Sequence, residues 1–261
     1  MIKLDRKPFY SFRGSLSKLD ASGKSRDVVA PIMRMKRDLE ARAIHYMRNR
    51  RSLENVGVVA NFSNISSELK SCYEGMPAPL RDELDDFRVK VLSKIRRCPY
   101  CLISEPYTND HYLPKEIYPE FSFLSCNLIP CCGWCNGKKG TRVVENGKRL
   151  YFNPYFDYLP NDFLGVDVSL SELYVSFHLL KEDEVVSTHV EKLGLIERYN
   201  FQGVSVITYV IEMMQMDEDL RDTEYFKREM RRERIKSESK FGVNHYEALI
   251  YKKLEELGPM A

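Results

Sequence analysis

The sequence has no long hydrophobic run, almost no net charge and a single tryptophan. It contains no stretch of about 18 apolar residues, so we expect no membrane span. The first residues, Met-Ile-Lys-Leu-Asp-Arg, lack the apolar segment of a secretory signal peptide, so we expect a cytoplasmic protein. A formal net charge of +2 excludes an overall basic field. Any affinity for nucleic acid must therefore come from local basic patches.

The composition is that of a globular protein, with 43% hydrophobic and 30% charged residues among 261. A chain of this length can bury a substantial core in one or two domains. The seven cysteines are odd in number, and most of them lie in one short window. This pattern favours metal binding in a reducing compartment over a framework of disulfides.

Two Cys-x-x-Cys pairs lie near the middle of the chain. Cys98 and Cys101 form the first pair, and Cys132 and Cys135 form the second. Two short turns that each carry two thiolates supply the four soft ligands of a tetrahedral zinc site. Cys131 could replace Cys132 as the third ligand, although a spacing of two residues favours Cys132 and would leave Cys131 as a small buried residue. We therefore predict a structural Zn²⁺ site.

Polar residues of a different kind lie between and just after these pairs. Asp110 and His111 are adjacent, so on an extended backbone their side chains point to opposite sides and can divide two roles. Asn136 precedes Lys139 by three residues, so both share one face of a helix. Phosphodiester hydrolysis needs a proton acceptor, for which histidine is suited, and a Lewis acid such as Mg²⁺. Two protein oxygens are enough to hold that ion.

The order Cys-x-x-Cys, Asp-His-x-x-Pro, Asn-Leu-x-Pro, Cys-x-x-Cys-Asn-x-x-Lys-Gly resembles the HNH endonucleases, whose core is a ββα-metal finger. The resemblance covers about residues 98–157. It implies that His111 is the general base, and that Asp110 and Asn136 bind the catalytic Mg²⁺ or Mn²⁺. It also implies that Asn127 is the middle residue of the signature, which fixes a loop and orients the histidine. Asn136 stands at the third signature position in place of histidine, which leaves the metal preference open.

The basic edge of the finger is the expected nucleic-acid contact. It comprises Lys138, Lys139 and Arg142, and the resemblance implies that Lys139 meets phosphate. The resemblance also implies DNA rather than RNA as the substrate. Trp134 lies inside the second cysteine pair, where it either packs against the zinc site, the favoured interpretation, or stacks on a base.

Outside the finger, hydrophobic periodicity predicts mostly helices. We expect an irregular arm over residues 1–26 and a finger helix from Asn136 to about Val143. A period-two pattern predicts a small antiparallel sheet between residues 163 and 190, including a strand at Val185-Val186. The other helices are expected over residues 27–51, 80–96, 191–216 with a possible break at Asn200, 217–240, and from Tyr246 to Leu257.

The predicted fold class is α+β, mostly helical, with a central zinc-stapled ββα-metal finger followed by a small antiparallel sheet. We expect a helical region at 1–94, the nuclease finger at 95–160, and the sheet with further helices at 161–261. The predicted function is that of a metal-dependent endonuclease. The layout also resembles HNH effectors of bacterial anti-phage modules, which implies a protein partner such as an ATPase subunit. The alternatives are a zinc-stabilised nucleic-acid-binding module without cleavage, and an adaptor within a larger complex.

Overall fold

The computed structural model describes residues 1–4, 9–180 and 183–260. The chain divides into two compact units, which we call the finger unit and the C-terminal unit. The described residues form a mixed α+β structure that is mostly helical, with small antiparallel sheets of two strands, which confirms the predicted fold class. The finger unit comprises residues 3–99 and 104–157, and the C-terminal unit comprises residues 1–2, 100–103 and 158–261.

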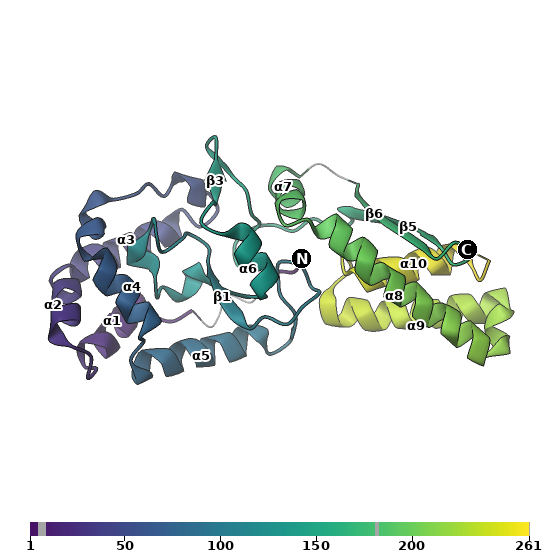
Figure 1. Ribbon diagram of the computed structural model, residues 1–261, viewed down its shortest axis with the longest axis horizontal. Helices are drawn as coiled ribbons and strands as arrows, with labels where there is room; N and C mark the ends of the chain where they lie inside the picture. The colour runs from purple at the N-terminus through teal and green to yellow at the C-terminus, as the bar shows by residue number, and fades with distance from the viewer. Residues whose placement is uncertain (5–8, 181–182, 261) are drawn as a thin grey trace. The chain divides into compact units, whose positions relative to one another are not determined.

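Helices make up most of the first hundred residues of the finger unit (Figure 1). The expectation of an irregular arm is wrong from Ser11 onward, because the Ser11 side chain accepts from Gly14 N and begins a helix that buries Leu16 and Leu19. Residues 5–8 of that stretch lie outside the described residues. These helices are α1 (Phe12–Asp20), α2 (Arg26–Arg34), α3 (Lys36–Arg48), α4 (Ser66–Glu74) and α5 (Ala78–Leu92).

The finger itself consists of two antiparallel strands followed by a helix. β1 (Thr108–His111) pairs with β2 (Leu128–Cys131), with His111 opposite Leu128. The helix, α6 (Gly133–Lys139), begins three residues before the predicted start. It also ends earlier than predicted, because Gly140 follows with φ of 55° and closes the last turn.

A short hairpin follows α6. β3 (Val144–Glu145) pairs with β4 (Lys148–Arg149) across the Asn146-Gly147 turn. Both turn residues have positive φ, at 51° and 75°, as a tight two-residue hairpin turn requires. The hairpin returns the chain to the body of the finger, where Arg149 is mostly buried and forms ion pairs with Glu54 and Asp157.

In the part of the C-terminal unit that the structure describes, the hairpin β5–β6 is followed by the helices α7 to α10 (Figure 1). The predicted strand at Val185-Val186 is wrong, because Asp183 accepts from Val186 N and caps a helix there. The predicted break at Asn200 is also wrong; the chain breaks at Gly194, where φ is 59°. The elements are β5 (Leu164–Ser169), β6 (Tyr174–Leu179), α7 (Glu184–Lys192), α8 (Leu195–Met216), α9 (Thr223–Phe241) and α10 (Tyr246–Leu257).

The core of the C-terminal unit depends on a close approach between helix and sheet. A Cβ at Gly203 of α8 would lie 2.7 Å from a methyl group of Val175 on β6, so only glycine fits there. Alternate residues Leu164, Val166 and Val168 of β5 are buried, as the period-two pattern predicts.

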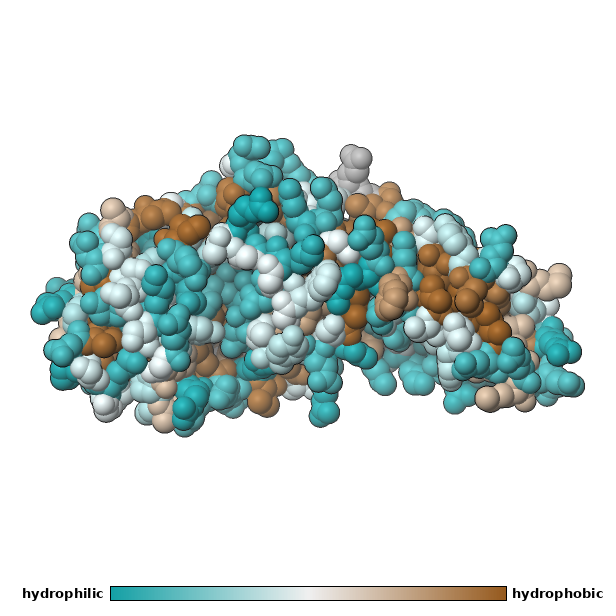
Figure 2. Space-filling view, viewed as in Figure 1, coloured by the Kyte–Doolittle hydropathy of each residue, from teal (hydrophilic) through white to brown (hydrophobic). Residues whose placement is uncertain are grey.

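Figure 2 shows a face covered mainly by hydrophilic side chains, with apolar ones in separate groups. Among the described residues, no helix is long and apolar enough to cross a membrane.

Candidate functional site

The four cysteines of the two pairs come together. The sulfur atoms of Cys98, Cys101, Cys132 and Cys135 all lie within 4.8 Å of one another, and all four residues are buried. Sulfurs around a tetrahedral zinc ion lie roughly 3.8 Å apart, given Zn–S bonds of about 2.3 Å. The spacing therefore fits four-coordinate binding, and the cluster could hold a metal such as zinc.

The choice of third cysteine is settled by the backbone. Cys131 is the last residue of β2 and Cys132 is the N-cap of α6, so their side chains point in different directions. Cys132 joins the cluster, as the spacing favours, whereas Cys131 contacts the hydroxyl of Thr108 at 3.5 Å. Burial raises the pKa of Cys131 to about 12, and it raises the pKa of Cys126 as well. Both of these thiols are therefore protonated and unreactive at neutral pH.

The turn of the first cysteine pair is fixed by backbone bonds. Cys98 N donates to Ser104 O at 2.8 Å, and Ile103 N donates to the sulfur of Cys101 at 3.5 Å. Leu102 adopts φ of 58°, which the reversal of the chain requires. An N–H group that donates to a cysteine sulfur stabilises its thiolate, the form that binds a metal.

Within the C-terminal unit, two side chains hold residues 100–103. The hydroxyl of Tyr199 donates to Cys101 O at 3.1 Å, and Nε2 of His189 lies 3.2 Å from Tyr100 O. Because a carbonyl only accepts, Nε2 of His189 carries a proton. Burial lowers the pKa of His189 to about 3, so the ring stays neutral in the folded protein. His189 is thus a structural residue of helix α7.

Asp110 and Lys139 form a buried ion pair between β1 and α6. Each of the two residues is only 2% exposed, and Nζ of Lys139 lies 2.9 Å from Oδ1 of Asp110. The same ammonium donates to His111 O at 2.9 Å and lies within 6 Å of the Tyr112 and Tyr151 ring centres. The ammonium of Lys139, which the resemblance assigns to phosphate, is therefore enclosed by protein and paired with the predicted metal ligand. A buried charge of this kind requires its partner.

His111 points away from this ion pair, because successive side chains of a strand alternate. Its Nε2 lies 2.8 Å from Ser122 O, and since a carbonyl only accepts, Nε2 carries the proton. In the neutral ring, Nδ1 then bears the lone pair that can accept a proton. The ring of Tyr73 on α4 meets the imidazole edge-on at 4.4 Å between centroids. Burial is the main cause that lowers the pKa of His111, which favours the neutral form.

Asn127 is fully buried and bonds only to backbone among the described contacts. Its Oδ1 accepts from Leu113 N at 2.8 Å, and its Nδ2 donates to Leu113 O at 3.0 Å and Phe121 O at 3.3 Å. These bonds tie together the two ends of the loop that follows β1. Because Ser122 comes next after Phe121, the carbonyl that contacts His111 belongs to this tied loop.

The predicted site residues therefore form two linked groups. Asp110 pairs with Lys139 where β1 faces α6, and Nδ2 of Asn136 on the same helix donates weakly to the hydroxyl of Thr108 on the same strand, at 3.4 Å. The imidazole of His111 lies in the other group, with Asn127 and its loop. The two groups are joined through the backbone of His111, whose carbonyl accepts from Lys139.

The outer face of the finger is basic and aromatic. Lys138 and Arg142 are exposed, in contrast to Lys139. Trp134 is 50% exposed, so the favoured interpretation that it packs as core is wrong.

The residue that sequence reasoning missed is Tyr73. It lies 38 positions before His111, and no local pattern indicates that α4 packs on the imidazole.

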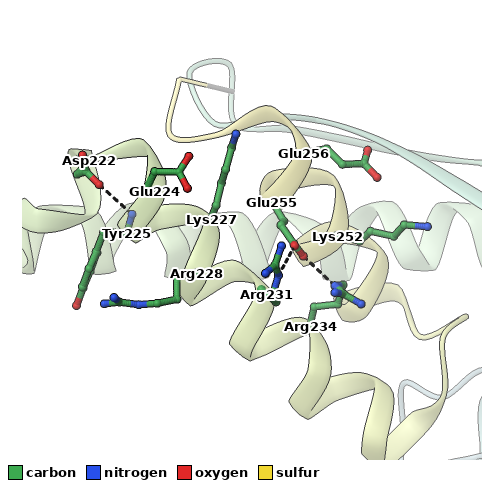
Figure 3. Close-up of a pocket in the computed structure, with 10 residues that line it drawn as sticks. All are labelled: Asp222, Glu224, Tyr225, Lys227, Arg228, Arg231, Arg234, Lys252, Glu255 and Glu256. Atoms are coloured by element: carbon green, nitrogen blue, oxygen red, sulfur yellow. Dashed lines mark hydrogen bonds and ion pairs between the residues drawn. The ribbon is translucent and has the colours of Figure 1, made fainter.

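A charged pocket of about 950 Å³ lies between α9 and α10 and contains none of the predicted site residues (Figure 3). Arg231 and Arg234 both bind Glu255, and Arg234 also pairs with Glu238 one turn along. Acidic and basic side chains alternate along α9, so the charges largely neutralise one another. The lining residues are Asp222, Glu224, Tyr225, Lys227, Arg228, Arg231, Arg234, Lys252, Glu255 and Glu256.

Comparison with known proteins gives two partial similarities. The chain is 35% identical over 106 residues to protein ea31 of Escherichia phage lambda, a match that covers 38% of this chain and 34% of that protein. It is 38% identical over 66 residues to the Septu protein PtuB of Bacillus thuringiensis, covering 23% of this chain and 25% of that protein. The matches thus span about a third and a quarter of these relatives. No protein-family model matches the chain, and no solved structure matches it significantly.

Proposed function

We propose that this protein is a metal-dependent endonuclease of the HNH type that hydrolyses phosphodiester bonds of DNA. The observation that carries the proposal is the arrangement around β1. An imidazole with its proton fixed on Nε2 directly follows, along β1, a carboxylate that faces the helix bearing Asn136, and the two side chains point to opposite sides of the strand. A non-catalytic scaffold does not need this combination of residue types in this order.

In this function His111 is the general base. Its Nδ1 accepts a proton from the water that attacks the phosphorus atom, while Nε2 stays bonded to Ser122 O. The lowered pKa keeps the ring neutral at physiological pH, the state in which it can accept. Asn127 is a positioning residue, because it ties the loop that supplies the Ser122 carbonyl.

Asp110 and Asn136 would hold the catalytic cation. A carboxylate oxygen and an amide oxygen are hard donors, which fit Mg²⁺ or Mn²⁺, and Mg²⁺ needs few protein ligands because it keeps several waters. Such an ion stabilises negative charge on the phosphate and on the departing 3′ oxygen. Lys139 places a fixed positive charge beside the same carboxylate, which favours an approaching phosphate even though its ammonium is enclosed.

The four-cysteine cluster would hold a structural Zn²⁺. Four thiolates leave no open coordination position, so this metal has no catalytic role. Its binding free energy would stabilise the junction of β2 and α6, since Cys132 caps that helix. The proposal divides the chain into a helical region at 1–94, the nuclease finger at 95–160, and a small sheet with further helices at 161–261.

The biological context we propose is anti-phage defence. The similarity to the Septu protein PtuB supports it, as does the resemblance to HNH effectors of defence modules. A protein partner, such as an ATPase subunit, would then control the nuclease. The exposed Lys138 and Arg142 would contact DNA phosphates.

One observation favours a second candidate, a zinc-stabilised nucleic-acid-binding module without cleavage. The Asp110 carboxylate already has a cation beside it in Lys139, so the pair can be purely structural. This module would bind DNA equally well with or without His111.

Plasmid cleavage separates the two functions. Purified protein is incubated with supercoiled plasmid and Mg²⁺, Mn²⁺ or no added divalent ion. Wild type and His111→Ala are compared with His178→Ala, a surface histidine on β6. We expect metal-dependent nicking by wild type and His178→Ala, and retained DNA binding without nicking by His111→Ala. Failure of the wild type to cut with either metal, both alone and coexpressed with its genomic neighbours, would refute the nuclease function.

A further inference from the structure

Two exposed aromatic side chains flank the start of α6. Trp134 is 50% exposed and Tyr107 is 68% exposed, and we call them the stacking pair. Large aromatic groups lose favourable burial when they stand in solvent, at about 25 cal/mol per Å². Two of them at the start of one short helix therefore indicate a surface that another molecule covers.

The backbone holds the stacking pair in place. A Cβ at Gly133 would overlap the phenol oxygen of Tyr107, so glycine at this position lets the tyrosine lie against the first turn of α6, the turn that carries Trp134. Tyr107 directly precedes Thr108, whose hydroxyl accepts from Asn136. The pair is thus fixed to the same two elements that carry Asp110 and Asn136.

A cation completes this surface. Lys138 lies one turn after Trp134 on α6, and its Nζ is 5.5 Å from the centre of the indole ring. An ammonium over an indole orders both side chains. Exposed Arg142 follows just after the helix. Aromatic rings with adjacent cations are the elements with which proteins bind single-stranded nucleic acid, the rings stacking on bases and the cations contacting phosphates.

We propose that the stacking pair binds unpaired nucleobases, with Lys138 on the adjoining phosphate, so that the substrate of the finger contains a single-stranded segment. This inference rests on the proposed nuclease function. A paired base in a duplex already stacks on its neighbours, whereas an unpaired base offers its face to a protein ring. A helix is about 10–12 Å across, so the bound bases lie a few nucleotides from the phosphate beside Asn136.

The single tryptophan makes the contact measurable, because intrinsic indole fluorescence reports Trp134 alone. The full chain is used as the His111→Ala variant, which removes cleavage from the readout. It is titrated with oligo(dT) of about 12 nucleotides, with oligo(rU) of the same length, and with a blunt duplex of that length. We expect quenching by a single strand and little by the duplex. Whichever single strand binds more tightly identifies the sugar that the site prefers.

Further substitutions in the His111→Ala variant test the role of Trp134. Stacking of one base contributes enough that Trp134→Ala should weaken single-strand binding, measured by anisotropy of a labelled oligonucleotide, by roughly tenfold or more. Trp134→Phe should keep most of the affinity, and Phe201→Ala, a matched exposed aromatic on α8, should keep all of it. Lys138→Ala should reduce the salt dependence of binding by about one phosphate contact.

The inference is overturned if Trp134→Ala binds the single strand as tightly as its parent, or if the duplex quenches as strongly as oligo(dT). These results are independent of catalysis. Wild type that cuts plasmid without any quenching refutes the stacking role alone. Wild type that is quenched by oligo(dT) but never cuts, either alone or coexpressed with its genomic neighbours, supports the stacking role and refutes the nuclease.

Discussion

Replacing Lys139 with methionine should destabilise the finger far more than the same change at its neighbour. Methionine preserves most of the side-chain volume and removes the ammonium. Asp110, which is 2% exposed and bonded to that ammonium at 2.9 Å, then remains buried without its partner. The carbonyl of His111 loses a donor as well.

The expected loss is about 3–5 kcal/mol, the cost of removing one member of a buried ion pair. In a protein of this size that corresponds to a fall in Tm of about 10 °C. Lys138→Met is the matched control, because Lys138 is exposed and its change should cost no more than about 0.5 kcal/mol. The assay is thermal unfolding followed by circular dichroism with zinc present throughout.

A double-mutant cycle isolates the pair. Asp110→Asn removes the charge that Lys139→Met leaves unpaired, so the double variant should lose much less than the sum of the two single losses. Asp110 and Lys139 would not form a buried pair if Lys139→Met had the same Tm as Lys138→Met. The same would follow if the losses of stability in Lys139→Met and Asp110→Asn were additive in the double variant. The role given to Asp110 would then need a different geometry.

Three other changes have defined outcomes. Cys132→Ser should remove about one equivalent of bound zinc, measured by mass spectrometry of the purified protein, whereas Cys131→Ser should keep it; equal zinc in both would contradict the ligand assignment. Asn127→Ala leaves the N–H of Leu113 and the carbonyls of Leu113 and Phe121 without their buried partner, so it should lower the free energy of unfolding in urea by about 3 kcal/mol. A loss below about 1 kcal/mol would show that the loop does not need the Asn127 side chain. His189 has a folded pKa of about 3 against an unfolded value near 6.5, so below about pH 6.5 the unfolded state binds one more proton and the free energy of unfolding declines by about 1.4 kcal/mol per pH unit. His189→Gln should remove the contribution of that one proton from the slope of unfolding free energy against pH. An unchanged slope would show that the ring is exposed to water.

The four-cysteine cluster and the opposite orientation of the Asp110 and His111 side chains could be predicted, because ligand spacing and strand alternation are local properties. The mostly helical α+β class and the β5–β6 hairpin could be predicted for the same reason, because the period of a hydrophobic pattern is visible within a few residues. The strand predicted at Val185-Val186 failed because capping by Asp183 outweighed the β propensity of valine.

What the sequence could not indicate is which distant groups meet. Asp110 and Lys139 lie 29 positions apart, and only the docking of α6 on β1 pairs them. Lys139 and Lys138 are adjacent and chemically alike, yet one is enclosed and the other exposed. The contact of Tyr73 with the imidazole depends on the packing of α4, which no motif encodes.

Chemical rescue of a His111 variant tests the central claim most directly, because it asks whether an imidazole at that position takes the proton from water. His111→Gly should lose plasmid cleavage in Mg²⁺, and added free imidazole should restore a measurable part of the rate, while Asp110→Asn should gain nothing from imidazole. Cleavage by His111→Gly at the wild-type rate without imidazole would contradict the account.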